Sequence, residues 1–271
     1  MQELVIEAGR AERQYWVDLW RYRELFYFLA WRDILIRYKQ TVVGAAWAVI
    51  RPLLTMLVLS VVFGRLAKMP THGEPYPLVV FCGLLPWQFF STALAESGNS
   101  LIMNSTLISK VYFPRMTVPA SSVMTSLVDL GISGILLAAL MLWYGAMPTA
   151  RIFFLPAFVL LALAAAAGAG VWVSALMVRY RDVRFVIPFV VQFGLYISPV
   201  GFSSDAVPAQ YRLLYSLNPI VGVIDGFRWA ILRNSALYWP GFLLSTAMVA
   251  LSLVQGVRYF RRTERTFADV I

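Results

Sequence analysis

Ionisable side chains interrupt the long apolar segments of this 271-residue chain. Asp129 lies within one apolar run, Glu96 follows another, and Arg51 lies inside a third. An ionisable group that faces hydrocarbon costs on the order of 3 kcal/mol, so such groups usually face a bundle interior or a wet cavity. Two chemistries follow from these residues. The acids could relay protons, or Arg51 could pair with Asp129 or Glu96 or bind an anionic ligand.

Small polar side chains accompany Asp129 at steps of three and four residues, namely Ser121, Ser122, Thr125, Ser126 and Ser133. This spacing places them on one face of a helix. We expect that face to point into the protein and away from lipid.

Several classes of catalytic site are excluded by the inventory of side chains. Cys82 is the single cysteine and His72 the single histidine, so a disulfide within the chain, a paired-thiolate metal site and Ser-His-Asp catalysis have no basis. No glycine is followed by lysine, so there is no phosphate-binding loop of the ATPase type. We expect no catalytic residues and no cofactor in this chain. If ATP powers it, ATP and Mg²⁺ bind to another polypeptide.

The composition is that of an integral membrane protein. Hydrophobic residues make up 60% of the chain and charged residues 14%, and the mean hydropathy is +0.70. The apolar runs are continuous, without the alternation of a barrel, so we expect an all-α fold in which each segment satisfies its own backbone hydrogen bonds. The net charge of +9 fits anionic lipids of the inner leaflet better than nucleic acid.

The apolar runs predict six spanning helices, at about residues 42–66, 78–95, 116–144, 152–178, 185–200 and 241–260. An amphipathic interfacial helix is predicted before them, over residues 19–39. Pro52, next to Arg51, is expected to interrupt the first span. Residues 208–217 and 220–232 predict two short helices at the outer face.

The chain is expected to form one transmembrane domain with both termini in the cytoplasm. Residues 1–41 would form a cytoplasmic and interfacial segment, 42–260 the bundle, and 261–271 a cytoplasmic tail. Most of the 23 basic residues then fall on the cytoplasmic side, as expected for a protein of a bacterial inner membrane.

A short polar and basic island, NSTLISKVYFPR, lies between the second and third spans at residues 104–115. Asn104 and its neighbours can cap a new helix, and Pro114 disfavours helical geometry at Phe113. Lys110 and Arg115 place this helix on the cytoplasmic side, where a partner could push on it.

Several blocks, in order, resemble one family of transporters. They are YKQTVVGAAWAVIRPL (38–53), GLLPWQFFSTAL (83–94), NSTLISKVYFPR (104–115), SPVGFSSDAVP (198–208) and LNPIVGVIDGFRWAIL (217–232). Together they are similar to the membrane subunit of polysaccharide ABC exporters, the Wzm-like O-antigen export permeases and their teichoic-acid and capsule relatives. The resemblance covers residues 23–262, nearly the whole chain.

The resemblance implies a homodimeric permease with a channel at its interface, two separate ATPase subunits below it, and a glycan on a polyprenyl pyrophosphate lipid as cargo. It implies contacts with the ATPase at Asn104, Ser105, Leu107, Ile108, Lys110, Val111, Tyr112 and Phe113, with Arg181 and Asp182 as a second contact. It also implies an external gate within residues 201–239, for which the aromatic candidates are Tyr211, Tyr215, Phe227 and Trp229.

Aromatic residues on the fifth span fall on one helical face, namely Phe185, Phe189, Phe193 and Tyr196. Flat rings suit a sliding sugar polymer, with Trp47 as a partner from the first span, but helix packing or lipid contact would also account for them. Arg37, Lys39 and Arg51 lie at the inner mouth, where guanidinium groups could bind pyrophosphate. For Arg37 and Lys39, contact with ordinary headgroups is the competing interpretation.

Three other functions compete with export driven by ATP. A proton-coupled transporter would use Asp129 and Glu96 and would need no ATPase. A membrane glycosyltransferase would need a catalytic pair, whereas the outer acids and His72 are scattered. A purely structural scaffold is disfavoured, because it would not require the polar face of the third span.

Overall fold

The computed structural model describes residues 12–39 and 42–267, and all of the regular elements in these ranges are helical. The longer helices are α1 (Glu12–Arg21), α2 (Arg23–Tyr38), α3 (Val42–Leu59), α4 (Tyr76–Met103), α6 (Thr117–Trp143), α7 (Leu155–Arg179), α8 (Val183–Ile197), α10 (Pro219–Ile231) and α11 (Trp239–Thr263). The shorter ones are η1 (Ser60–Leu66), α5 (Ser105–Lys110), η2 (Ala150–Phe154), η3 (Ser204–Ala206), α9 (Ala209–Tyr215) and η4 (Glu264–Thr266). Parts of the predicted segments 1–41 and 261–271 lie outside the described residues.

Five helical segments are long and apolar enough to cross a membrane, at Ala46–Leu66, Tyr76–Met103, Thr117–Trp143, Ala150–Arg179 and Trp239–Thr266. The all-α fold is therefore confirmed. The predicted fifth span corresponds to α8, which has 15 residues and is shorter than these five. At 1.5 Å per residue it measures about 22 Å, less than a hydrocarbon layer of about 30 Å.

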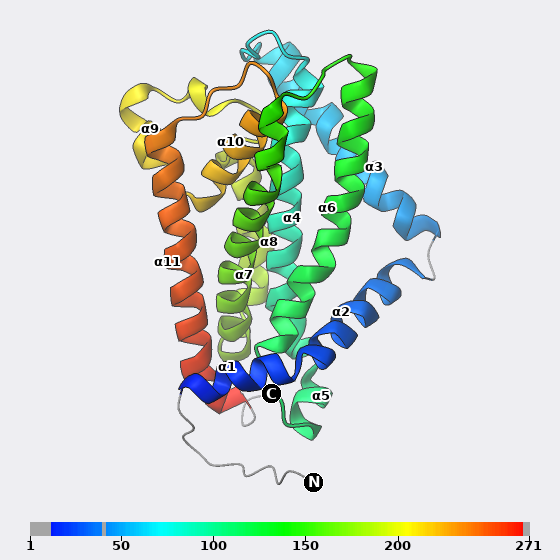
Figure 1. Cartoon of the computed structure of the whole chain (residues 1–271), viewed down its shortest axis with the longest axis vertical. Coiled ribbons are helices and arrows are strands. Elements are labelled where there is room, and N and C mark those ends of the chain that lie inside the picture. The colour runs from blue at the N-terminus through cyan, green and yellow to red at the C-terminus, as the bar shows by residue number, and fades with distance from the viewer. Residues whose placement is uncertain (1–11, 40–41, 268–271) are drawn as a thin grey trace.

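The centre of the bundle is α4, which packs against α6, α7 and α10 (Figure 1). Its residues 78–87 are all buried, because neighbouring helices surround its N-terminal half. Small residues bring α7 and α11 together: a Cβ on Gly256 would lie 2.3 Å from the carbonyl oxygen of Gly168. Such backbone approach is how membrane helices gain contact without a hydrophobic driving force.

The two ends of the bundle differ in what they carry. Helices α1, α2 and α5 lie at the end where α11 finishes, and α9 and α10 lie at the opposite end (Figure 1). Helix α2 runs obliquely past the base of α6, while α3 lies at the side of the bundle and packs against α4 and α6 (Figure 1). At the first end, Leu29 of α2 joins a buried cluster with Ile108, Phe113 and Phe260.

Three local predictions are wrong. Helix α3 continues through Pro52, and the departure from α-helical geometry comes later, in the π-helical η1. Helix α4 does not end near residue 95 but continues through Glu96 to Met103. Asn104 makes no side-chain cap, since its amide donates to the carbonyl of Ser100 and its Oδ1 accepts from Arg32.

The polar face of the third span is confirmed as an inward face. Its small members, Ser121, Ser122, Thr125, Ser126 and Ser133, are all buried. Several of these hydroxyls donate to carbonyls three or four residues earlier in α6, which satisfies them within the helix.

Candidate functional site

A groove of about 550 Å³ lies between α3, α4 and α8. Its polar lining comes from all three helices and consists of Arg51, Thr55, Gln88, Ser91, Thr92, Glu96 and Gln192. The four α4 residues recur at helical spacing, so they form one stripe. Amides, hydroxyls and a charge of each sign in otherwise apolar surroundings are typical of a site for a polar ligand.

The carboxylate of Glu96 belongs both to this groove and to an ionic cluster beneath it. Arg37 of α2 forms ion pairs with Glu96 and, at 2.6 Å, with Asp129 of α6. The hydroxyl of Tyr38 also donates to Asp129, and that of Ser126 donates to Glu96 at 3.3 Å. One guanidinium therefore lies between two partly exposed carboxylates and offsets one of their two charges.

Of the two alternatives predicted for Arg51, the pairing with Asp129 or Glu96 is not found, since both acids pair with Arg37, and the binding of an anionic ligand stays a prediction. Arg51 is exposed and lines the groove, and none of the carboxylates that the structure describes forms an ion pair with it. Lys39 is exposed at the end of α2. Of the three basic residues predicted for the inner mouth, Arg51 thus faces the groove and Arg37 lies in the ionic cluster.

The predicted aromatic residues form a surface separate from the groove. Phe185, Phe189, Phe193 and Tyr196 are 67%, 58%, 51% and 58% exposed, and Trp47 on α3 is 56% exposed. None of these five lines the groove. Ile187 is the one buried residue of α8, so most of this helix has no covering element within the described part of the chain.

A close approach of α8 to α4 sets one wall of the groove. A Cβ on Gly194 would lie 2.4 Å from the ring of Trp87, which itself lines the groove. Glycine at this position lets the indole lie directly against the backbone of α8.

The predicted coupling residues divide between core and surface. Ile108 and Phe113 are buried, at 5% and 4% exposure, so they anchor the segment to the bundle. Asn104, Ser105 and Leu107 are partly buried. Lys110, Val111 and Tyr112 are exposed and are the predicted residues that a partner protein could reach. Arg181 and Asp182 are exposed in the turn before α8.

Hydrogen bonds tie the segment after α5 to the end of the chain. The backbone N–H of Arg115 donates to Oε1 of Glu264 at 2.8 Å, and its guanidinium donates to the carbonyl oxygen of Glu264 at 2.5 Å. Arg261 lies over the ring of Tyr15 from α1, 4.7 Å from its centroid. Helices α1 and α11 and the segment after α5 therefore meet at one point.

The four predicted gate residues have different environments. Tyr211 is 54% exposed, whereas Phe227 is 1% exposed and lies in the core. The hydroxyl of Tyr215 donates to the carbonyl of Ile197, at the end of α8. Trp229 packs edge-on against Phe158 of α7. Tyr211 is therefore the gate candidate with the largest exposed surface.

Arg228 is a buried cation that joins several elements at the end of the bundle that carries α9 and α10. It is 3% exposed and donates to the carbonyls of Val79, Phe202 and Val200 at 3.1, 2.7 and 2.8 Å. Burial lowers its pKa below the ordinary value, and the nearby Asp225 opposes that shift. The guanidinium joins α10 to α4 and to the segment after α8.

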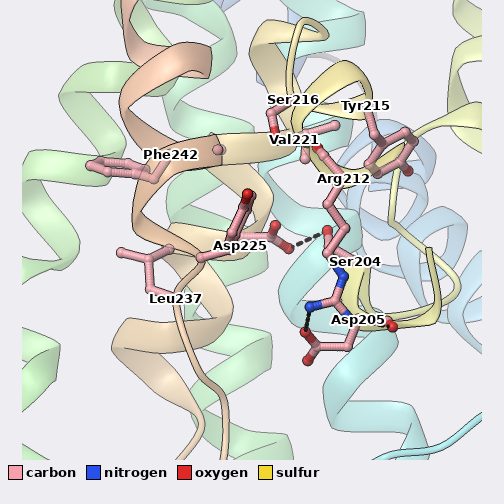
Figure 2. Close-up of a pocket in the computed structure, with 12 residues that line it drawn as sticks. Ser204, Asp205, Arg212, Tyr215, Ser216, Val221, Asp225, Leu237 and Phe242 are labelled. Atoms are coloured by element: carbon pink, nitrogen blue, oxygen red, sulfur yellow. Dashed lines mark hydrogen bonds and ion pairs between the residues drawn. The ribbon is translucent and has the colours of Figure 1, made fainter. Parts of the chain in front are cut away.

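Asp225 lies beside this network and next to a small cavity (Figure 2). Burial raises its pKa to about 6, and both Arg228 and a 2.8 Å hydrogen bond from the hydroxyl of Ser204 oppose the rise. The cavity, with a volume of about 10 Å³, has about the space of one water molecule. The groove between α3, α4 and α8 is therefore the larger candidate site.

Comparison with known proteins identifies the family. The family model described as ABC-2 type transporter matches residues 24–232. The chain belongs to the ABC-2 type transporter family. It is 27% identical to the O-antigen export system permease protein RfbA of Myxococcus xanthus, over 94% of this chain and 98% of that protein. It is 25% identical to the RfbA protein of Klebsiella pneumoniae, over 89% and 92%.

A more distant relative is the polysialic acid transport protein KpsM of Escherichia coli, which is 23% identical over 82% of this chain and 89% of that protein. The resemblance to polysaccharide export permeases is thus confirmed. The groove, the ionic cluster and α5 all lie within the region matched by the ABC-2 family model.

Two elements of this ABC-2 transporter were missed from the sequence. Arg228 was assigned to an outer helix without a role, although a lone arginine in an apolar helix is itself a signal of an internal partner. The stripe of Gln88, Ser91, Thr92 and Glu96 was missed because Glu96 was placed beyond the second span. Helical spacing applied across residues 88–96 would have found it.

Proposed function

We propose that this chain is the permease subunit of an ATP-driven exporter. Its cargo is a polysaccharide linked to a polyprenyl pyrophosphate lipid, similar to an O-antigen, and it moves from the cytoplasmic to the outer side of a bacterial inner membrane. Teichoic acid and capsular polysaccharide are the alternative cargoes. The observation that carries the proposal is the groove of about 550 Å³ lined by amides, hydroxyls and Arg51 in a chain whose relatives are named as export permeases.

The groove has the chemistry that a lipid-linked glycan needs. The amides of Gln88 and Gln192 and the hydroxyls of Thr55 and Thr92 can exchange hydrogen bonds with sugar hydroxyls. Arg51 presents a planar fork that can bind two phosphate oxygens at once. The groove therefore receives the pyrophosphate at Arg51, with Lys39 nearer the inner mouth.

The permease works with six spans and with both termini in the cytoplasm. Helix α8 is the fifth span, and its short length is supplemented by the turns that flank it. Helices α9 and α10 act as external gate helices, with Tyr211 and Tyr215 on α9. The concentration of basic residues at the end that carries α2, α5 and the end of α11 supports this orientation.

A second copy of the chain covers the exposed aromatic surface of α8. Phe189 and Phe193 lie with their ring centroids 4.2 Å apart and are both more than half exposed. Two such surfaces facing each other would line a channel whose walls offer flat apolar faces to sugar C–H groups. A homodimer places Trp47 of α3 beside the same channel.

A separate ATPase subunit supplies the energy and binds ATP and Mg²⁺. It contacts the exposed side chains of Lys110, Val111 and Tyr112, with Arg181 and Asp182 as the second contact. Ile108 and Phe113 are buried, so a movement of α5 is transmitted through their contacts to the bundle.

Deletion of the gene in a strain that makes a surface polysaccharide tests the proposal. We expect the surface glycan to be lost and its lipid-linked form to accumulate on the cytoplasmic side, and we expect the intact gene to restore export. The matched variants are Tyr112→Ala, which should reduce export, and Tyr144→Ala, an exposed tyrosine at the opposite end of α6, which should not. Normal surface glycan in the deletion strain would refute the proposal.

A further inference from the structure

Helix α2 contacts both the coupling segment and the groove, although it belongs to neither. At its centre, the guanidinium of Arg32 donates to Oδ1 of Asn104 at 2.9 Å. Asn104 is the junction between α4 and α5, so the contact is with the first residue of the coupling segment. Leu29, 1% exposed, packs in the same buried cluster as Ile108 and Phe113.

The other contact lies five residues further along the same helix. Arg37 pairs with Glu96 on α4 and Asp129 on α6, and Tyr38 donates to Asp129. Glu96 also lines the groove. The rise from Arg32 to Arg37 is about 7.5 Å, so the two contacts sit on a single rigid piece of helix.

The ion pair between Arg37 and Glu96 sets the net charge that the groove presents to a ligand. With Arg37 in place, the carboxylate is offset and Arg51 is the dominant charge facing an anionic ligand. If Arg37 moves away, an uncompensated carboxylate shares the groove with Arg51. A negative charge in the lining of the same groove disfavours a bound pyrophosphate.

We propose that α2 links α5 to the groove and that the Arg37–Glu96 pair sets the affinity of the groove for anionic cargo. Movement of α5 carries α2 with it through Leu29 and Arg32, separates Arg37 from Glu96 and weakens the hold on the pyrophosphate. This inference rests on the proposed function, because it takes α5 as the contact with the ATPase. Arg32 and Arg37 are positioning residues in this account.

Thermodynamic linkage gives the inference a measurable consequence. If the position of α5 changes the affinity of the groove for cargo, then bound cargo must change the equilibrium between the positions of α5 by the same free energy. The ATPase subunit that contacts α5 is affected in turn. Cargo should therefore alter ATP hydrolysis, and it should do so through α2.

The test uses the permease with its ATPase subunit in phosphatidylethanolamine and phosphatidylglycerol vesicles, with polyprenyl pyrophosphate as the probe. The readout is the hydrolysis rate with the lipid divided by the rate of the same variant without it. We expect Arg32→Met and Arg37→Met to lower this ratio toward one, at least a fivefold loss of stimulation. Arg23→Met, on the exposed start of the same helix, is the matched control and should keep the full ratio.

Two further comparisons separate coupling from folding. Arg37→Lys keeps a cation within reach of both Glu96 and Asp129 and should retain at least half of the stimulation. Full stimulation in an assembled Arg37→Met complex, or stimulation of Arg37→Lys as low as that of Arg37→Met, would overturn the inference. If Arg37→Met fails to assemble, Arg32→Met decides, since it removes the contact with Asn104 and the local ion pair with Asp33 but leaves Arg37 paired with Glu96 and Asp129. A wild-type chain that binds no ATPase would instead refute the proposed function.

Discussion

Arg228→Met removes the cation that joins α10 to α4 and to the segment after α8. The variant keeps a side chain of similar length but leaves the carbonyls of Val79, Val200 and Phe202 without their donor. Each unsatisfied buried acceptor costs about 1–3 kcal/mol, and part of that cost is offset because no charge is buried. We expect a net destabilisation of about 3–5 kcal/mol, the range seen when one member of a buried ionic network is removed.

The assay is thermal denaturation of the purified protein in detergent, followed by tryptophan fluorescence. A loss of this size should lower the midpoint by on the order of 10 °C for a chain of this length. Arg233→Met is the matched control, because Arg233 lies five residues away and is exposed. A midpoint for Arg228→Met within about 2 °C of the control would refute the assignment of Arg228 as the link between these elements.

Three further predictions follow from the structure. Gly168→Ala should destabilise the protein by about 1–3 kcal/mol in the same assay, because its Cβ would lie 2.7 Å from the α11 backbone. The control Gly134→Ala should be neutral or stabilising, since a Cβ at Gly134 has open space around it. Asp225→Asn should flatten the pH dependence of the melting midpoint. The pKa of Asp225 is raised to about 6 in the folded protein, against an ordinary value of 3.8. The carboxyl therefore contributes stability below pH 4 that is lost as the pH rises toward 6. Lys110→Ala and Tyr112→Ala should weaken binding of the ATPase several-fold in a pull-down while leaving the melting midpoint within about 1 °C, since both side chains are exposed.

The spanning helices could be predicted from the sequence because each depends on a local property, the length of an apolar run. The boundaries of α6 and α7 were obtained within three residues in this way. The end of α4 was missed because hydropathy treats Glu96 as exposed, whereas the structure compensates its charge with Arg37 from α2. Pro52 was expected to interrupt α3, but the helix continues through it.

The candidate site was harder to predict than the helices. The aromatic residues of α8 were identified from their spacing, and the structure shows them exposed on the protomer. The choice of partner for Asp129 could not be made from spacing, because it depends on where α2 docks against α6. Arg37 and Arg51 are 14 positions apart, and only the tertiary arrangement shows which one reaches the acids.

Reconstituted export tests the central claim most directly. The permease and its ATPase subunit are placed in vesicles with lipid-linked glycan on the outer leaflet, where ATP is supplied, and glycan reaching the lumen is measured by its protection from an added glycosidase. The account predicts protection that depends on ATP, disappears when the phosphate-loop lysine of the ATPase is replaced, and falls sharply when residues 104–113 are exchanged for a flexible linker. Equal protection without ATP, or with the permease alone, would contradict it.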